Sequence, residues 1–136
     1  MKCDMAEIPI GAKNEQKVLV TPDIAIDFLG HEGGRVLATP HMIMLMEMTC
    51  RNLIKSFVEE GFDSVGTEVN VKHLAATPIG MSVTFQAEVL EVNDRRVLCR
   101  VEAFDEQEKI GEGTHERFVI NVARFASRLA VKLAAK

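Results

Sequence analysis

The chain has 136 residues, of which 47% are hydrophobic and 26% charged, and it carries a net charge of −4 at pH 7. This length predicts one domain, residues 1–136, and leaves no room for a separate cofactor-binding domain. The negative charge and the lack of Trp and Tyr disfavour a nucleic-acid-binding protein. No apolar run approaches the roughly 20 residues that cross a bilayer, so we expect a cytoplasmic protein with no membrane partner.

The cysteines and histidines form no recognisable metal or redox motif. Cys3, Cys50 and Cys99 lack Cys-x-x-Cys spacing, and we expect them to be reduced thiols. The four histidines are scattered along the chain without the spacing of metal ligands. The sequence therefore predicts no metal site and no cofactor.

Two short segments precede the main predicted helix. Val18–Val20 is an apolar run that we assign as the start of the sheet. Phe28–Arg35 is rich in glycine but lacks the lysine and the spacing of a phosphate-binding loop. We interpret this second segment as a flap or connector.

A long helix is predicted from Pro40 to about Glu60, with Thr39 as its N-cap and Gly61 as its stop. Glu47 is the only charged residue in the stretch His41–Cys50, which would be apolar on nearly all sides of a helix. Such a helix is expected to be buried, and its carboxylate with it.

From Val65 onward apolar residues alternate with polar ones, which predicts four strands in an antiparallel meander with a hairpin turn at Asn93-Asp94. One long helix followed by a meander predicts an α+β fold in which an antiparallel sheet wraps around one central helix. The exposed sheet edges favour a homodimer or a dimer of dimers. The residues expected to face the core are Thr67, Val69, Val71, His73 and Ala75 in the first strand, Met81, Val83, Phe85, Ala87 and Val89 in the second, and Val97, Cys99, Val101 and Ala103 in the third, and the fourth strand is expected from Ile110 to about Val122.

The C-terminal segment has basic residues at every fourth position and no acid among them. A helix there would carry a basic ridge on one side and an apolar face on the other. The ridge is either an ordinary solvated surface or an electrostatic landing site for an anionic ligand such as a nucleotide phosphate. The basic residues are Arg124, Arg128, Lys132 and Lys136, and the apolar ones are Phe125, Leu129 and Leu133.

Three residues are candidates for chemistry. Burial disfavours the charged form of a carboxylate, so Glu47 is a candidate acid, base or nucleophile, or else a partner of Arg51 one helical turn away. His73 is either a satisfied core histidine or a proton shuttle. Thr39 either caps the helix or lies beside backbone donors that stabilise an oxyanion. About 12 Å of helix separates Thr39 from Glu47, so His73 must bridge them or a second protomer must supply one of them.

The last strand places His115 and Arg117 on the same face as Gly111 and Gly113. Bare backbone beside an arginine leaves room for an anionic or carbonyl ligand. The alternative is a bulge or bend with a surface arginine.

Three groups of motifs in this sequence resemble the hotdog-fold thioesterases of the fluoroacetyl-CoA thioesterase type. The similarity covers about residues 17–125. The matching segments are Val36–Pro40 with Leu45–Glu47, Val65–Thr67 with His73–Pro78, and Gly113–Arg117.

The resemblance implies a hotdog fold and a catalytic set of Thr39, Glu47 and His73 at a dimer interface. It also implies substrate contacts from Gly66 and Arg117. The phenylalanine lid of the fluoroacetyl-specific enzyme has no counterpart in the segment Gly30–Gly34, which favours a different acyl group.

The resulting prediction is an acyl-CoA thioesterase that releases a carboxylic acid and free CoA from its acyl-CoA substrate. Two alternatives stay open at this point: a noncatalytic acyl-CoA or acyl-carrier binding protein, and a hotdog hydratase or dehydratase, which acts on the acyl chain and releases no thiol. The choice between coenzyme A and acyl carrier protein as the carrier also stays open.

Overall fold

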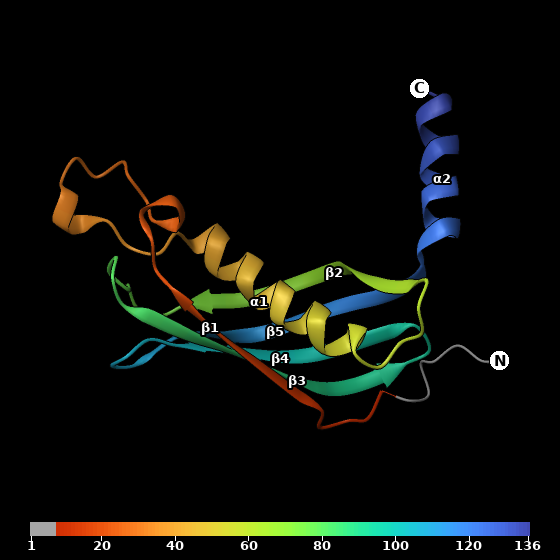
Figure 1. The fold of residues 1–136 in the computed structure, drawn as a ribbon, viewed down its shortest axis with the longest axis horizontal. Coiled ribbons are helices and arrows are strands. Elements are labelled where there is room, and N and C mark those ends of the chain that lie inside the picture. The colour runs from red at the N-terminus through yellow and green to blue at the C-terminus, as the bar shows by residue number, and fades with distance from the viewer. Residues whose placement is uncertain (1–7) are drawn as a thin grey trace.

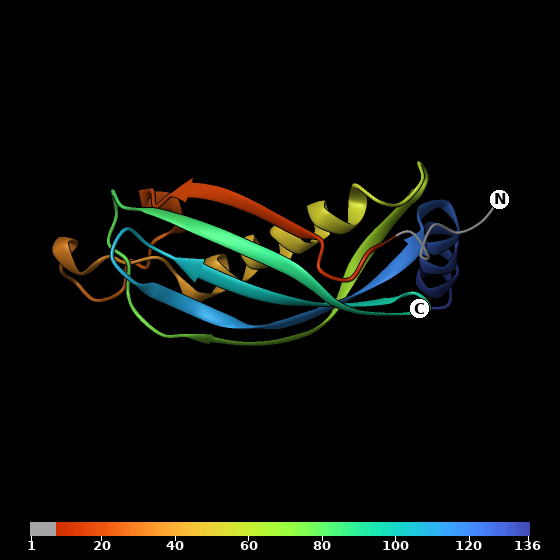
Figure 2. The ribbon, with the colours of Figure 1, turned by 90° about the horizontal axis from the view of Figure 1, so that it is seen from below.

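The computed structural model describes residues 8–136 and shows a curved, five-stranded antiparallel sheet that wraps around one long helix (Figures 1 and 2). The predicted α+β hotdog architecture is therefore confirmed. Cys3 lies outside the described residues. The elements are β1 (Lys13–Leu19), two short 3-10 turns (Pro22–Ile24 and Glu32–Gly34), α1 (Thr39–Lys55), β2 (Phe62–His73), β3 (Ser82–Asn93), β4 (Arg96–Phe104), β5 (Lys109–Asn121) and α2 (Val122–Ala134), and the strand order across the sheet is β1-β3-β4-β5-β2.

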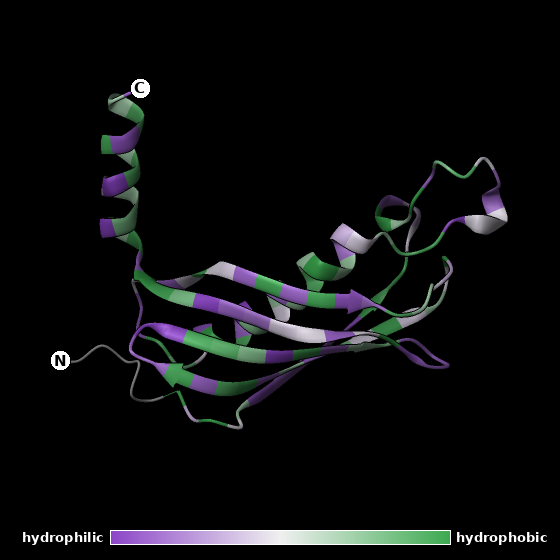
Figure 3. Cartoon of the chain, turned by 180° about the vertical axis from the view of Figure 1, so that it is seen from behind, coloured by the Kyte–Doolittle hydropathy of each residue, from purple (hydrophilic) through white to green (hydrophobic). Residues whose placement is uncertain are grey.

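The core lies between α1 and the concave face of the sheet. As predicted, alternate residues of β3 and β4 point inward, and each is at most 2% exposed. The opposite face of the sheet shows polar residues between apolar ones along the strands (Figure 3). The inward residues are Val83, Phe85, Ala87 and Val89 in β3, Val97, Cys99, Val101 and Ala103 in β4, and they pack against Met42, Met46, Cys50, Leu53 and Ile54 of α1.

Both ends of α1 differ from the prediction. Ala38 is the N-cap and Thr39 the first helical residue, so Thr39 does not cap the helix and its hydroxyl is free for another partner. The helix ends at Lys55 rather than near Glu60. Ser56 Oγ donates a 2.7 Å hydrogen bond to the Leu53 carbonyl, which offers the backbone an alternative to further helical turns.

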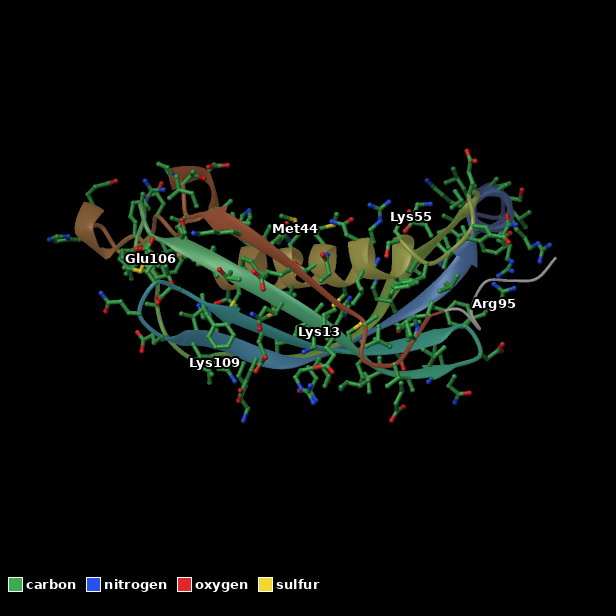
Figure 4. All side chains as sticks on the ribbon, turned by 60° about the horizontal axis from the view of Figure 1, so that its bottom comes forward. Lys13, Met44, Lys55, Arg95, Glu106 and Lys109 are labelled. Atoms are coloured by element: carbon green, nitrogen blue, oxygen red, sulfur yellow. The ribbon has the colours of Figure 1, made fainter. Side chains whose placement is uncertain are left out.

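One face of α1 is open to solvent in the single chain. Met44 is 47% exposed and Met48 40%, and the side chain of Glu47 beside them is 35% exposed. Figure 4 labels Met44 on this outer side of the helix. The expectation of burial on nearly all sides is therefore wrong for one chain, and Met44, Glu47 and Met48 form what we call the open face of α1.

Strand β1 begins five residues before the predicted run at Val18–Val20. Its inward side chains are polar: Asn14 Nδ2 donates to the Thr49 carbonyl at 3.1 Å, and Gln16 Nε2 donates to the Leu45 carbonyl at 3.1 Å. Because these residues bond to the helix instead of burying apolar surface, hydrophobic alternation did not reveal them.

Strand β2 is a sheet edge, paired only with β5. The expected inward residue Val69 is 43% exposed, and the register shifts between Gly66 and Glu68, where a bulge leaves Thr67 without a Cα partner. An unpaired edge of this length is a template for a further strand. Neither helix within residues 8–136 combines the length and hydropathy of a membrane span.

The glycines of β5 make room for neighbouring protein, which contradicts the expectation of space for a ligand. A Cβ on Gly111 would lie 2.8 Å from Met42 Sδ. A Cβ on Gly113 would lie 2.1 Å from the Asn70 carbonyl oxygen and 2.6 Å from the Cα of Val71.

The variant Gly113→Ala should therefore lower the free energy of unfolding by about 2 kcal/mol or more, because backbone atoms of β2 would have to move. Urea unfolding followed by circular dichroism measures the change. Gly34→Ala is the matched control, since its nearest neighbour is at an ordinary 3.6 Å, and it should change stability by less than about 0.5 kcal/mol. Equal stability of Gly113→Ala and the wild type would show that β2 and β5 are farther apart than described.

Candidate active site

Thr39 and His73 form a direct pair. Thr39 Oγ1 lies 2.7 Å from His73 Nδ1, so the first residue of α1 contacts the last residue of β2. A 2.9 Å hydrogen bond from the Leu37 amide to the Thr77 carbonyl ties the chain before α1 to the chain after β2, and it holds the pair together. Two of the three predicted catalytic residues therefore meet in one chain.

The His73 ring is suited to accept a proton. Burial lowers the pKa of His73, which favours the neutral ring near pH 7. Its Nε2 atom is buried and has no hydrogen-bond partner within residues 8–136. A neutral imidazole that contacts a hydroxyl is the arrangement by which a histidine activates a nucleophile as a general base.

A surface pocket of about 390 Å³ opens beside this pair. Phe28, which is 78% exposed, contributes an aromatic side chain to it from the segment before α1. The sequence analysis looked for lid aromatics only within Gly30–Gly34 and missed this residue. The pocket is lined by Ile26, Phe28, Val36, Leu37, Thr39, His73, Leu74, Ala75 and Ala76, an apolar wall with one hydroxyl and one imidazole.

Arg35 fastens the segment that carries Phe28. Its Nε donates to the Ile26 carbonyl at 3.0 Å, and its Nη2 donates to the Pro22 carbonyl at 2.8 Å. These bonds close the glycine-rich loop on itself, so the connector is a defined wall of the pocket.

Glu47 lies over β2 and β5 rather than beside Arg51. The expected ion pair does not form, because Arg51 Nη2 binds Asp63 Oδ2 at 2.6 Å. Glu47 Oε2 is instead 3.7 Å from His115 Nε2. A Cβ on Gly66 would approach Glu47 Oε2 to 2.8 Å, so the carboxylate fits only because residue 66 is glycine.

Arg117 is buried beneath this carboxylate and is not the surface arginine that the bulge hypothesis required. It is 7% exposed; Nε and Nη2 donate to Ser64 Oγ and the Ser64 carbonyl, each at 2.7 Å. His115 Nδ1 donates to the Glu68 carbonyl at 2.9 Å, so His115 Nε2 accepts from Arg117 Nη1 at 3.0 Å. Burial lowers the pKa of both side chains.

The five predicted site residues therefore fall into two groups in one chain. Thr39 and His73 lie at one end of α1, and Glu47, Gly66 and Arg117 lie two helical turns away. Within residues 8–136, no hydrogen bond or salt bridge joins Glu47 to Thr39 or His73. His73 does not bridge the two groups within this chain, which leaves the second possibility, a contribution from another copy.

Comparisons with known proteins give one consistent result. The family described as fluoroacetyl-CoA-specific thioesterase matches residues 20–123. The fluoroacetyl-CoA thioesterase of Streptantibioticus cattleyicolor is 43% identical over 97 residues, which cover 71% of this chain and 70% of that protein.

Solved structures agree with the sequence match. A structure of the fluoroacetyl-CoA thioesterase FlK is 36% identical, with a TM-score of 0.83 over 91% of this chain and 96% of the other. A thioesterase superfamily member from Thermus thermophilus is 32% identical, with a TM-score of 0.81 over 95% and 98%. A hot-dog-like protein from Thermanaerovibrio acidaminovorans is 23% identical with a TM-score of 0.85 over 93% and 94%, which supports the fold alone.

The burial of His73 predicts that its ring titrates below 6.5, the ordinary value, in the folded protein. Because its folded pKa lies below the unfolded one, protonation opposes folding, and this contribution to stability should fall as pH drops below the unfolded value. NMR titration of the ring resonance, assigned by its loss in His73→Gln, measures the pKa. A value above 6.5 would show that a carboxylate stabilises the charged ring, contrary to the environment described.

Proposed function

The chain belongs to the fluoroacetyl-CoA-specific thioesterase family, a family of thioester hydrolases, and on this premise we propose that two copies of it jointly build each site for acyl-CoA hydrolysis. The observation that carries the proposal is the 2.7 Å contact between Thr39 and a neutral His73 at the edge of an apolar pocket. Mutants of FlK were solved in complex with fluoroacetate and CoA, and with acetyl-CoA. These ligands support an acyl-CoA substrate for the present chain.

The free edge of β2 and the open face of α1 support the role of a second copy. Antiparallel pairing of two β2 strands, centred between Val69 and Asn70, would place His73 of one copy opposite Gly66 of the other. Glu47 lies above Gly66 in each chain. Each Thr39–His73 pair would then meet the Glu47 of the second copy, and the exposed Met44 and Met48 would be covered at the interface.

The geometry suggests a division of roles. Thr39 Oγ attacks the thioester carbonyl carbon while His73 Nδ1 takes the hydroxyl proton. Collapse of the tetrahedral intermediate expels the CoA thiolate, which recovers this proton from His73 as a thiol. Glu47 then activates a water that hydrolyses the acyl-threonine ester. Amide groups near Gly66 and the first turn of α1 are the candidate donors for the oxyanion, with Arg117 holding the floor beneath them.

The acyl group is expected to occupy the pocket beside Thr39. Its lining from Ile26, Val36 and Leu74 is apolar, and Phe28 covers one side. This lining suits a small or medium acyl chain, and we assign no selectivity for fluoroacetyl-CoA.

The variant Glu47→Gln separates these roles. We expect a burst of thiol release of about one equivalent per site, followed by turnover about 1000-fold slower than wild type, because the acyl-threonine forms but hydrolyses slowly. Thiol release from acetyl-, fluoroacetyl-, branched, aromatic and long acyl-CoAs measures the rates, and mass spectrometry locates the acyl group on Thr39. Loss of the burst together with turnover would instead make Glu47 the nucleophile, and unchanged turnover would remove it from the mechanism.

A mixture of two inactive variants tests the shared site. In a dimer of one His73→Ala copy and one Glu47→Gln copy, one site receives both wild-type residues, and the other site receives neither. Random reassociation should therefore restore roughly a quarter of wild-type activity. If both residues of a site come from the same chain, the mixture stays inactive. The double variant His73→Ala/Glu47→Gln mixed with His73→Ala is the control and should recover nothing.

A further inference from the structure

A second, smaller pocket lies where β5 runs into α2, at the end of the sheet away from Thr39. Its volume is about 100 Å³, and three arginines, Arg95, Arg124 and Arg128, line it together with Phe118 and Phe125. Figure 4 labels Arg95 at the base of α2. We call this the α2 pocket. It takes no part in the site described above.

The α2 pocket is strongly electropositive. No aspartate or glutamate lines it, and within residues 8–136 none of its three arginines forms a salt bridge. Arg95 has one weak internal contact, from Nη1 to the Val119 carbonyl at 3.5 Å. Three guanidinium groups around one hollow, on a chain whose net charge is −4, indicate a site for an anion with several negative oxygens.

Backbone structure adds to this charge. The first turn of α2 contains no acidic residue, and Asn121 Oδ1 accepts a hydrogen bond from the Arg124 amide at 3.0 Å. The positive end of the helix dipole therefore adds to the arginine charges at the same place. Since α2 has 13 residues, this field is that of a full helix.

The two phenylalanines narrow the class of anion. Phe118 is 36% exposed, and Phe125 is partly buried beside it, so two aromatic rings border the charged hollow. Aromatic faces next to arginines bind bases by stacking while the guanidinium groups bind phosphates. A phosphorylated nucleotide has both of these chemical groups, whereas a simple inorganic anion or an acyl chain has only one or neither.

The position of the α2 pocket relates it to the thioester. Arg117 pairs with Gly66 across β5 and β2, and Asn121 lies four residues farther along β5. At about 3.3 Å per residue, the pocket begins next to Arg117 and extends about 13 Å from it. The extended pantetheine arm of coenzyme A covers such a distance between the thioester sulfur and the nucleotide.

We propose that the α2 pocket binds the phosphorylated adenosine of coenzyme A, with the three arginines on its phosphates and the phenylalanines against its base. This inference rests on the proposed hydrolysis of acyl-CoA, and it assigns coenzyme A rather than acyl carrier protein as the carrier. The α2 segment thereby selects the carrier, while the Thr39 pocket selects the acyl group.

The double variant Arg124→Glu/Arg128→Glu tests the pocket. We expect KM for acetyl-CoA to rise about 30-fold with kcat within about twofold, because charge reversal acts on the nucleotide and not on the thioester. Acetyl-pantetheine, which has the thioester but no nucleotide, should be hydrolysed equally well by variant and wild type. Lys132→Glu/Lys136→Glu makes the same charge change on the same helix outside the pocket, and its KM should change by less than about threefold.

Calorimetric titration with adenosine 3′,5′-bisphosphate gives a readout that does not require hydrolysis. Wild type and the Lys132→Glu/Lys136→Glu variant should bind it, and the arginine variant should bind at least about tenfold more weakly. Failure of wild type to bind, equal effects of the two double variants, or an equal loss with acetyl-pantetheine would each overturn the proposal. Nucleotide binding without thiol release from any thioester would refute the proposed hydrolysis and leave the nucleotide site intact.

Discussion

The close approach of α1 to the sheet determines where every site residue lies. At Gly111 the helix is so near β5 that an added Cβ would contact Met42 Sδ at 2.8 Å. At this depth the start of α1 brings Thr39 to the end of β2, and two turns later it brings Glu47 over Gly66. The reactive groups are thus positioned by the packing of one helix on one sheet, which holds geometry better than loops do. Two glycines and a set of flexible methionine side chains make that packing possible.

Much of the architecture followed from local patterns. In β3 and β4 apolar and polar residues alternate without interruption, so the hydrophobic effect alone predicts which side chains are buried. The prediction failed where a hydrogen bond replaces apolar burial. Strand β1 was shortened because Asn14 and Gln16 face the helix, and α1 was extended because nothing in the pattern shows that Ser56 binds a backbone carbonyl.

The candidate site was recoverable in part for a similar reason. Thr39, Glu47 and His73 could be named from their residue types and from motif resemblance, but partners in space could not. Arg51 stood one helical turn from Glu47, yet it binds Asp63, because the bidentate geometry available across the loop exceeds a single contact along the helix. The burial of Arg117 depends on Ser64, a residue 53 positions away in the chain, and sequence spacing carries no signal for such a contact.

The polar inner side of β1 gives this edge a distinct response to solvent. Its separation from α1 would break the hydrogen bonds of Asn14 and Gln16 but would expose little apolar surface. Denaturants act in proportion to the surface that an opening exposes, so detachment of β1 should depend only weakly on urea, whereas separation of β4 from the core should depend on it strongly. The sheet thus has one margin held by polar contacts that water can replace and a centre held by exclusion of water, and its first excursions from the native state should begin at the former.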